Sequence, residues 1–262
     1  MKISHEVPLC LLEKSLEFNN YQYALPHLLD QNKEYRDFFL KAKKDGVYII
    51  MDNSLHELGE AYTQERLLFW INELHPNEFF VPDVWEDMNA SIENAKAWKA
   101  LELPKDILLS AVVQAKNVEE AKNCYQEYKR LGYEKIAFSY GNSFYNKVSG
   151  NEGNYGKAFG RYLLIKEFFE KDIFNKEDRI HLLGCSLPQE FGWYDRHGFI
   201  NIESIDTSNP IMATIEGWRY NEEGLRIKPT MNMNSCFNIS LDKINMELLE
   251  HNVKMFKTIN KI

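Results

Sequence analysis

The chain has 262 residues, a hydrophobic content of 44% and a formal net charge of −8 at pH 7. A chain of this length can bury one large core, and α/β barrels of this size are usually single domains, so we expect one domain over residues 1–262. The negative charge argues against a generally basic surface that coats nucleic acid, but a local basic patch on an acidic protein is compatible with a nucleic-acid substrate.

The sequence lacks the features of membrane and disulfide-rich proteins. No stretch approaches the roughly 18 consecutive apolar residues of a membrane helix, and the first residues have no signal-peptide pattern. The four cysteines are far apart, so they indicate neither a disulfide framework nor a zinc knuckle. We therefore expect reduced thiols, no metal, no membrane contact and a cytoplasmic protein, in the host cytoplasm if it is viral.

Apolar segments of strand length alternate with amphipathic helical segments along most of the chain, which is typical of βα units around a parallel sheet. The expected strands are residues 7–12, 47–52, 78–82, 107–113, 134–139, 180–185, 200–206 and 224–228. Eight strands predict an α/β fold of the (β/α)₈ TIM-barrel type. Because the last strand is short and partly charged, a barrel that is incomplete or distorted there is the alternative.

Several local patterns predict helices between these strands. Asn117 can cap one helix, and Thr63 precedes another. Asn209 followed by Pro210 is typical of a helix start, because proline suits the first helical turn. The aromatic-rich segment 13–46 is expected to form the first crossover, with extra helix.

The glycine-rich segment 150–160 resembles a phosphate-binding loop only superficially. Its glycine spacing is one residue too long for a Walker motif, and Ala158 stands where Ser or Thr would hold magnesium. We expect a flexible loop at the barrel mouth. Lys157 and Arg161, one helical turn apart, could contact a DNA phosphate from it.

Two aspartates, Asp52 and Asp206, each close an apolar segment. Barrel enzymes keep their chemistry at the carboxyl ends of the strands, and a pair of carboxylates can supply a nucleophile and an acid/base. A lone strand-end aspartate is more often a helix cap or a loop anchor. The pair nevertheless predicts an enzyme.

Five strand-end motifs follow one another from Asp52 to Pro210. They are Met51-Asp52-Asn53-Ser54-Leu55, Val81-Pro82-Asp83-Val84-Trp85, Ala111-Val112-Val113-Gln114-Ala115, His181-Leu182-Leu183-Gly184 and Asp206-Thr207-Ser208-Asn209-Pro210. In order and spacing they resemble the motifs of the tRNA-guanine transglycosylase superfamily, whose barrel exchanges guanine for a 7-deazaguanine. The first motif departs from that family's Asp-Ser-Gly-Gly-Phe, because both glycines are missing.

The resemblance implies a role for each strand end. Asp206 would be the nucleophile and Asp52 the general acid/base, while Asp83 and Gln114 would read the base. The segment Ser139-Tyr140-Gly141 resembles a Gly-Gly-Leu segment whose backbone lines the base pocket, and Gly184 closes the sixth-strand motif. The aromatic residues that could stack on the base are Tyr140, Trp85 and Phe80. His181 opens a buried strand, where a histidine is usually hydrogen-bonded rather than catalytic.

The family's Cys-x-Cys-x-x-Cys zinc site has no counterpart, since only Cys236 and His251 lie in that region. The resemblance is therefore to phage-type relatives that insert 7-deazaguanines into DNA. It implies guanine-containing DNA and a free 7-deazaguanine base as substrates, and no cofactor. A partner protein or a homo-oligomer would fit an acidic chain without an evident DNA-binding module.

Three alternatives remain. The same fold could modify tRNA, which the missing zinc site disfavours, or it could be a noncatalytic base-binding or accessory subunit, which the two retained aspartates disfavour. An unrelated barrel lyase or aldolase would normally need a strand-end lysine for a Schiff base. The only such lysine, Lys228, lies on the least certain strand.

Overall fold

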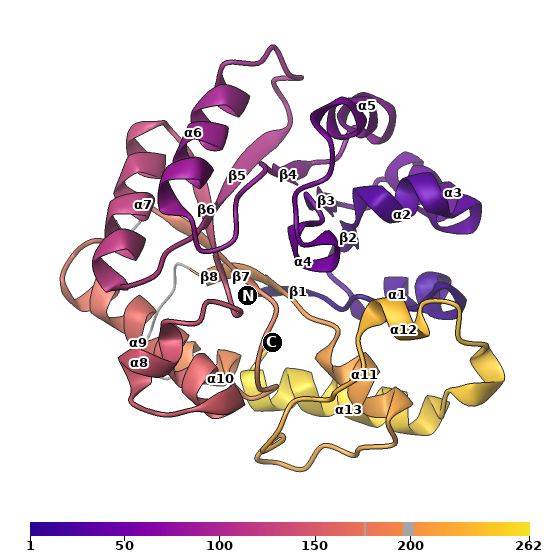
Figure 1. The fold of residues 1–262 in the computed structure, drawn as a ribbon. Coiled ribbons are helices and arrows are strands. Elements are labelled where there is room, and N and C mark those ends of the chain that lie inside the picture. Colours follow the sequence, from indigo (N-terminus) through magenta and orange to yellow (C-terminus); the bar gives the residue numbers. More distant parts are fainter. Residues whose placement is uncertain (176, 196–201) are drawn as a thin grey trace. The chain divides into compact units, whose positions relative to one another are not determined.

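The structure is a computed structural model that describes residues 1–175, 177–195 and 202–262. Parallel strands alternate with helices to form a nearly closed (β/α)₈ TIM barrel (Figure 1), which confirms the predicted fold class. The strands are β1 (Lys2–Ser4), β2 (Gln22–Ala24), β3 (Ile49–Met51), β4 (Glu78–Phe80), β5 (Leu108–Val113), β6 (Lys135–Ser139), β7 (Arg179–Leu183) and β8 (Ile202–Asp206). Their order in the sheet is β1-β8-β7-β6-β5-β4-β3-β2.

The helices of the described residues lie between the strands and after β8. They are η1 (Leu9–Leu11), α1 (Leu12–Phe18), α2 (Pro26–Gln31), α3 (Lys33–Lys44), α4 (Leu55–Leu58), α5 (Gln64–Leu74), α6 (Met88–Lys99), α7 (Val118–Arg130), α8 (Tyr145–Ser149), α9 (Gly153–Glu170), α10 (Phe191–Asp195), α11 (Asn209–Ile215), α12 (Met233–Cys236), η2 (Leu241–Lys243) and α13 (Met246–Asn260). The helix expected after Thr63 is α5. The helix expected after Asn117 is α7.

The seam of the barrel falls between β1 and β2, the two ends of the sheet order, and not at the last strand as the sequence suggested. Asn20 binds the edge of β1. Its N–H donates to the Ile3 carbonyl (2.8 Å), and its side-chain Oδ1 accepts from the Ile3 N–H (2.9 Å). The side chain thus stands in for a missing ladder bond beside β1.

Two expected strands are wrong. Residues 7–12 form η1 and the start of α1, and residues 224–228 form no strand. Their places are taken by β1 and β2, each only three residues long, so segment 13–46 contains a strand as well as helices. The strand expected over 200–206 is observed as β8 from Ile202, and its first two residues lie outside the described part of the chain.

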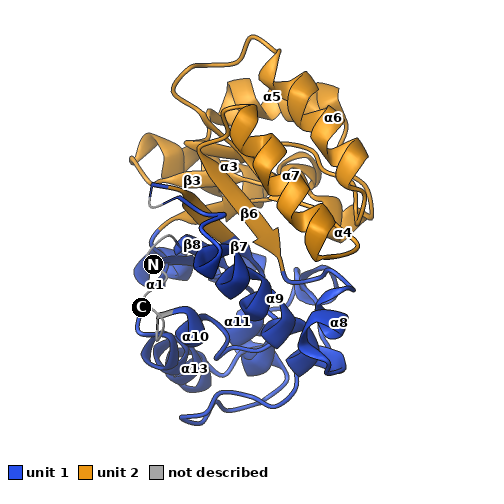
Figure 2. Cartoon of the chain, turned by 90° about the vertical axis from the view of Figure 1, so that its left-hand side faces the viewer, with its two compact units in different colours: residues 1–20, 140–177, 182–262 blue, residues 21–139, 178–181 orange. Residues whose placement is uncertain are grey.

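The chain divides into two compact units (Figure 2). Unit 2 comprises residues 21–139 and 178–181, and unit 1 comprises residues 1–20, 140–177 and 182–262. Inside unit 2, buried Lys135 of β6 pairs with Glu78 of β4 (2.8 Å), which also accepts from Ser110 of β5 (2.7 Å). Three adjacent strands are thereby tied together through one buried ion pair, which satisfies each charge without water.

Helix α7 of unit 2 forms where local signals predict it. Asn117 accepts from the Glu120 N–H (2.9 Å) and so caps the helix, and Gly132 beyond the carboxyl end adopts a positive φ of 78°. Buried Tyr125 and Tyr128 lie one turn apart or less on the apolar face. The helix therefore packs on the sheet by the stripe that the sequence shows.

In unit 1, the segment 150–160, expected to be a flexible loop, belongs largely to helix α9, which begins at Gly153. A Cβ at Gly160 would lie 2.0 Å from the Tyr145 carbonyl oxygen, so only glycine allows this approach of α8 to α9. The glycines of the segment serve close helix packing and not a phosphate cradle. At α11, Ser208 is the N-cap residue, and Asn209 with Pro210 forms the first turn.

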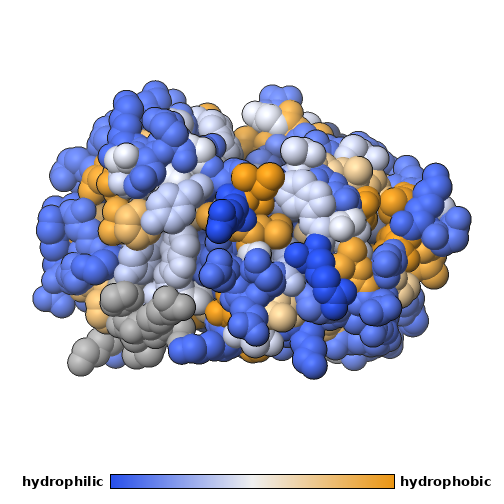
Figure 3. Space-filling view, turned by 90° about the horizontal axis from the view of Figure 1, so that it is seen from below, coloured by the Kyte–Doolittle hydropathy of each residue, from blue (hydrophilic) through white to orange (hydrophobic). Residues whose placement is uncertain are grey.

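Hydrophilic residues cover most of the face drawn in Figure 3, and hydrophobic residues there form separate areas. Among the described residues, every helix is too short or too polar to cross a membrane. The apolar content of the sequence is instead found in buried side chains of strands and helix faces.

Candidate functional site

Three strand ends of unit 2 meet in a buried polar cluster. Asn53 follows β3, Asp83 lies shortly after β4, and Gln114 follows β5. Gln114 Nε2 donates to Asp83 Oδ2 (2.6 Å), and Asn53 Nδ2 donates to Asp83 Oδ1 (2.7 Å). All three side chains are buried. The carboxyl group of Asp83 is thus held from both sides by amide donors.

The same bonds fix the cluster to the backbone. Asn53 Nδ2 also donates to the Val81 carbonyl (3.0 Å), and Gln114 Oε1 accepts from the Glu86 N–H (3.0 Å). Because each amide is used at both ends, neither can flip without losing a buried bond. The orientation of the Asp83 carboxyl group is therefore set by its neighbours.

Burial, at 4% exposure, raises the pKa of Asp83 to about 7. The hydrogen bonds from Gln114 and Asn53 oppose this rise, and the negative charge of Asp52 adds to it. Asp52 therefore lies near enough to Asp83 to repel it. The structure brings together three of the predicted residues, Asp52, Asp83 and Gln114, and adds Asn53, which the sequence analysis missed.

The turn after β3 positions Asp52 and Asn53 without the glycines of the family motif. Asp52 N–H donates to the Ala24 carbonyl (2.9 Å), and Asn53 Oδ1 accepts from the Leu55 N–H (2.9 Å). Ser54 stands where that motif has its first glycine and takes a left-handed φ of 66°. Its hydroxyl contacts His27 Nδ1 (2.8 Å), which helps to offset the strain of that conformation.

The aromatic residues near these strand ends differ in accessibility. Phe80 is fully buried, and its ring contacts His181 (centroids 5.0 Å apart), so it is not available to stack on a base. His181 is also buried and stacks on Tyr23, which agrees with the structural role that its sequence position suggested. Trp85 is 39% exposed and lies against His56.

In unit 1, Asp206 ends β8 and is also 4% exposed. Burial raises its pKa to about 7, while the Gly184 N–H, the charge of Arg161 and a hydrogen bond with Glu6 oppose the rise. Strand β1 pairs with β8 in a register that sets Ser4 opposite Asp206. Glu6, two residues after Ser4, is a site residue that the sequence analysis missed.

Arg161 of α9 is a structural residue, and the predicted phosphate contact is corrected accordingly. Its side chain is fully buried, and its Nε donates to Glu190 Oε1 (2.7 Å). Its two terminal nitrogens donate to the carbonyls of Leu183 (2.9 Å) and Gly184 (2.8 Å). A guanidinium that is already bonded on three nitrogens inside the protein has no room for a phosphate.

Gly184 links Arg161 to Asp206 through its backbone. Its carbonyl accepts from Arg161, and its N–H donates to Asp206. It has a φ of 59°, and a Cβ there would lie 2.4 Å from Cδ1 of Tyr140. Tyr140 in turn accepts from Lys228 Nζ (2.7 Å), whose ammonium lies 4.0 Å from the ring centroid. Lys228 thus holds the Tyr140 ring that lies against Gly184, although it lies on no strand.

The remaining predicted residues occupy the end of β6 and α9. Ser139 ends β6 in unit 2 and is 8% exposed, while Gly141 is buried in unit 1. Lys157 Nζ donates to the Gly141 carbonyl (3.1 Å). Its predicted phosphate contact stays a prediction, since Lys157 is half-buried and already bonded to this carbonyl.

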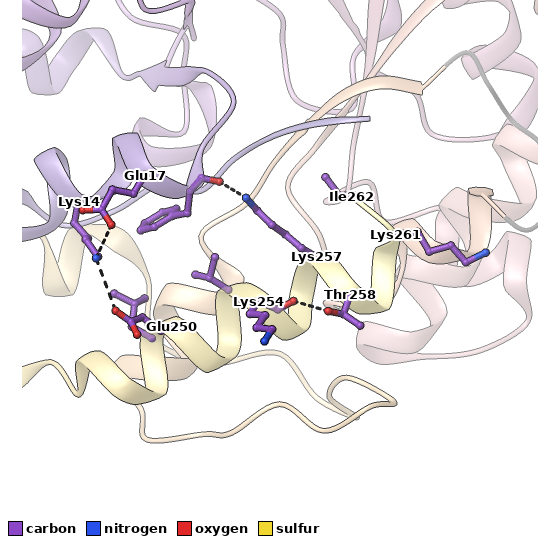
Figure 4. A pocket seen from close by; sticks show the side chains of 11 residues that line it. Lys14, Glu17, Glu250, Lys254, Lys257, Thr258, Lys261 and Ile262 are labelled. Carbon is purple, nitrogen blue, oxygen red and sulfur yellow. Dashed lines mark hydrogen bonds and ion pairs between the residues drawn. The ribbon is translucent and has the colours of Figure 1, made fainter.

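A cavity of about 500 Å³ lies between α1 and α13 in unit 1 (Figure 4). Its lining combines apolar side chains with four lysines. They are Lys14, Lys254, Lys257 and Lys261. Lys257 Nζ donates to the Phe18 carbonyl (2.5 Å), and Lys14 pairs with Glu17 (2.6 Å). None of the predicted site residues lines this cavity.

No group of three or more His, Cys, Asp and Glu side chains within the described ranges is arranged to hold a metal ion. No model of a protein family matches the chain, and no curated protein matches it. The two strand-end clusters, one in each unit, are the features of the chain that bear on its function.

Proposed function

We propose that the protein is a pentosyltransferase that exchanges guanine in DNA for a 7-deazaguanine base through a covalent aspartyl-deoxyribose intermediate. The observation that carries the proposal is the pair of buried strand-end acids, Asp83 and Asp206, whose pKa values are each raised to about 7. Acids with raised pKa values at the carboxyl ends of barrel strands are typical of active sites.

Asp206 is the nucleophile in this proposal. Its ionised carboxylate forms a bond to C1′ of a deoxyguanosine, and the electron pair of the C1′–N9 bond leaves with guanine. In the second step, N9 of the incoming base attacks C1′ and the carboxylate departs. The N–H of Gly184 and the nearby charge of Arg161 favour the ionised form, which is the reactive form.

Asp52 is the general acid and base. The departing guanine must gain a proton and the incoming deazaguanine must lose one, so one carboxyl group can serve both steps. Asp52 is half-buried, unlike Asp83, and can therefore exchange protons with water between the two steps.

Asp83 and Gln114 read the base. The Watson–Crick edge of guanine presents two N–H groups and a carbonyl, and a flipped base is recognised on that edge. An ionised Asp83 can accept from the N–H groups, and the second Nε2 hydrogen of Gln114 can reach a carbonyl oxygen. The bonds that already hold these two side chains would keep them oriented before the base arrives.

One feature favours DNA over tRNA as the polymer. The sequence lacks the cysteine-rich zinc site of the tRNA-modifying family that its motifs resemble. The test is incubation with guanine-containing DNA and, in a parallel arm, with tRNA. A labelled 7-cyano- or 7-aminomethyl-7-deazaguanine is the incoming base, and label in each polymer is counted. Label in tRNA alone contradicts the polymer assignment.

Trapping the covalent adduct separates an enzyme from a binding module. Wild type is mixed with DNA without the incoming base, denatured, and examined by intact mass. We expect an adduct in wild type and none in Asp206→Asn. Asp45→Asn, at an exposed residue beyond α3, is the matched control and should keep the adduct. Binding of labelled base with no adduct in any variant would instead support a noncatalytic subunit.

A further inference from the structure

The cavity between α1 and α13 lies within unit 1, and its volume of about 500 Å³ suits a small molecule. Its apolar floor consists of Phe18 from α1 and Leu249 and Val253 from α13. Leu249 and Val253 are buried, whereas Phe18 is half-buried. The cavity therefore offers apolar surface from two helices to a group that enters it (Figure 4).

The lysines of the lining differ in whether a carboxylate neutralises them. Lys14 Nζ pairs with Glu17 (2.6 Å) and with Glu250 (3.8 Å), so both acidic side chains of the lining pair with this lysine. Lys254 and Lys257, the lysine pair, lie one turn apart on α13. Within the ranges that the structure describes, no carboxylate forms an ion pair with either of them. The α13 side of the cavity thus carries positive charge that the protein does not offset.

Lys257 is held in place at the cavity wall. Its Nζ donates to the Phe18 carbonyl (2.5 Å). Burial lowers the pKa of Lys257, and among the described residues no carboxylate counters that effect. An ammonium group has three donors, so the bond to Phe18 leaves others for an acceptor that enters the cavity. An anion is the acceptor that these surroundings favour most.

We propose that the cavity binds a small organic anion, whose apolar body lies on the apolar floor and whose head group, a carboxylate or a phosphate, accepts from the lysine pair. Lysine is a point charge that suits either head group, so the shared chemistry is an anion joined to an apolar body. A nucleic-acid strand carries a phosphate on every residue, and the carboxylates of Glu17 and Glu250 disfavour so many negative charges. The inference does not depend on the proposed function, because the cavity lies apart from both strand-end clusters.

The probe for binding is anilinonaphthalenesulfonate, an organic anion whose fluorescence rises in an apolar site. Decanoate, deoxyguanosine monophosphate and inorganic phosphate are then added to the wild-type complex as competitors. We expect decanoate or the nucleotide to displace the probe, and the stronger of the two identifies a fatty acid or an organic phosphate as the source. Inorganic phosphate has no apolar body and should compete roughly tenfold more weakly or worse.

Three outcomes of the competition overturn the proposal. The first is that no organic anion displaces the probe. The second is that inorganic phosphate competes as well as the organic anions, which removes the role of the apolar floor. The third is that a short DNA oligonucleotide displaces the probe at a lower concentration than both organic anions.

Variants of the lysine pair place the bound anion. Lys254→Met and Lys257→Met each remove one ammonium group and should weaken probe binding by roughly tenfold or more, as expected for the loss of a hydrogen bond to a charged group. Lys254→Arg keeps the charge and should retain most of the binding. Lys44→Met, at an exposed residue of α3, is the matched control and should bind as wild type.

Lys254 is exposed, so its substitution tests the proposal even if loss of the Phe18 contact unfolds Lys257→Met. Equal binding in wild type, Lys254→Met and Lys257→Met overturns the proposal. An equal loss in Lys44→Met also overturns it, because binding would then follow the overall charge of the protein and not this cavity.

A second readout follows Lys257 directly. The ¹³Cε signals of labelled lysine are titrated by NMR with and without saturating decanoate, with Lys257→Met identifying the signal. A bound anion should raise the pKa of Lys257 toward its ordinary value, because it supplies the negative charge that is missing there. An unchanged pKa of Lys257 with decanoate bound would place the anion elsewhere and overturn the proposal.

Discussion

Asp83 makes the stability of the protein depend on pH in a way that can be measured without substrate. Its pKa is about 7 in the folded protein against an ordinary value of 3.8, so the folded state binds more protons than the unfolded state between these values. Stability must then fall as the pH rises through this window, by about 1.4 kcal/mol per pH unit and about 4 kcal/mol in total. Above about pH 7, this contribution should stay constant.

The isosteric variant Asp83→Asn removes the titration. Its new amide group faces one of the two donors, Asn53 or Gln114, which costs about 1–2 kcal/mol at every pH. Asp83→Asn should therefore be less stable than wild type at low pH and more stable at about pH 8, and the two curves should cross near pH 5.

Urea unfolding at several pH values between about 5 and 8 measures both curves. Over this range, wild type should lose about 3 kcal/mol relative to Asp83→Asn. Asp45→Asn is the control for removing an exposed aspartate and should run parallel to wild type. Parallel curves for wild type and Asp83→Asn would refute the reasoning. They would show that the free energy of unfolding does not depend on the ionisation of Asp83.

Two further changes test the surroundings of Asp206 through the free energy of unfolding. Gly184→Ala should cost about 2–4 kcal/mol, because its Cβ meets the Tyr140 ring, whereas Gly217→Ala, with a positive φ but open space, should cost about 1. Equal losses of unfolding free energy in Gly184→Ala and Gly217→Ala, measured in urea, would show that the Tyr140 ring moves away from the new Cβ at no cost. Arg161→Met should cost about 3–5 kcal/mol by leaving Glu190 buried without its cation, and adding Glu190→Gln should restore part of that loss. No recovery in the double variant would contradict this.

The parts of the fold that the sequence predicts are those with strong local patterns. Strands β5, β6 and β7 are runs of five or six residues, and α7 has a capping asparagine and a terminal glycine. Strands β1 and β2 have three residues each, and Lys2-Ile3-Ser4 contains a single apolar side chain. A strand this short is defined by pairing with β8 or β3, which is a tertiary contact that no local pattern carries.

In the candidate site, too, the sequence predicts what local patterns define and misses what tertiary contacts define. Asp83 and Gln114 could be predicted to meet because consecutive parallel strands end at the same edge of a sheet. The role of Asn53 depends on the direction of its side chain after a turn, which sequence spacing does not give. Glu6 was missed because the strand before it was misplaced, and Arg161 was assigned to phosphate because its burial depends on Glu190, 29 residues away.

A comparison with Asp30 shows what separates a structural acid from Asp83 and Asp206. Burial alone would raise the pKa of Asp30, but hydrogen bonds from Arg66 and Tyr62 lower it below its ordinary value. The side chains that bond to Asp83 are the amides of Gln114 and Asn53, neither of which carries a positive charge.

The cation near Asp206, Arg161, is also bonded to Glu190, and its charge offsets only part of the cost of burying Asp206, whose pKa remains raised. Each of these two acids therefore lowers stability at neutral pH by up to about 4 kcal/mol, a cost that a neutral asparagine would avoid. Selection for stability alone would remove such groups, so two of them at strand ends of a barrel favour a catalytic reason for their presence.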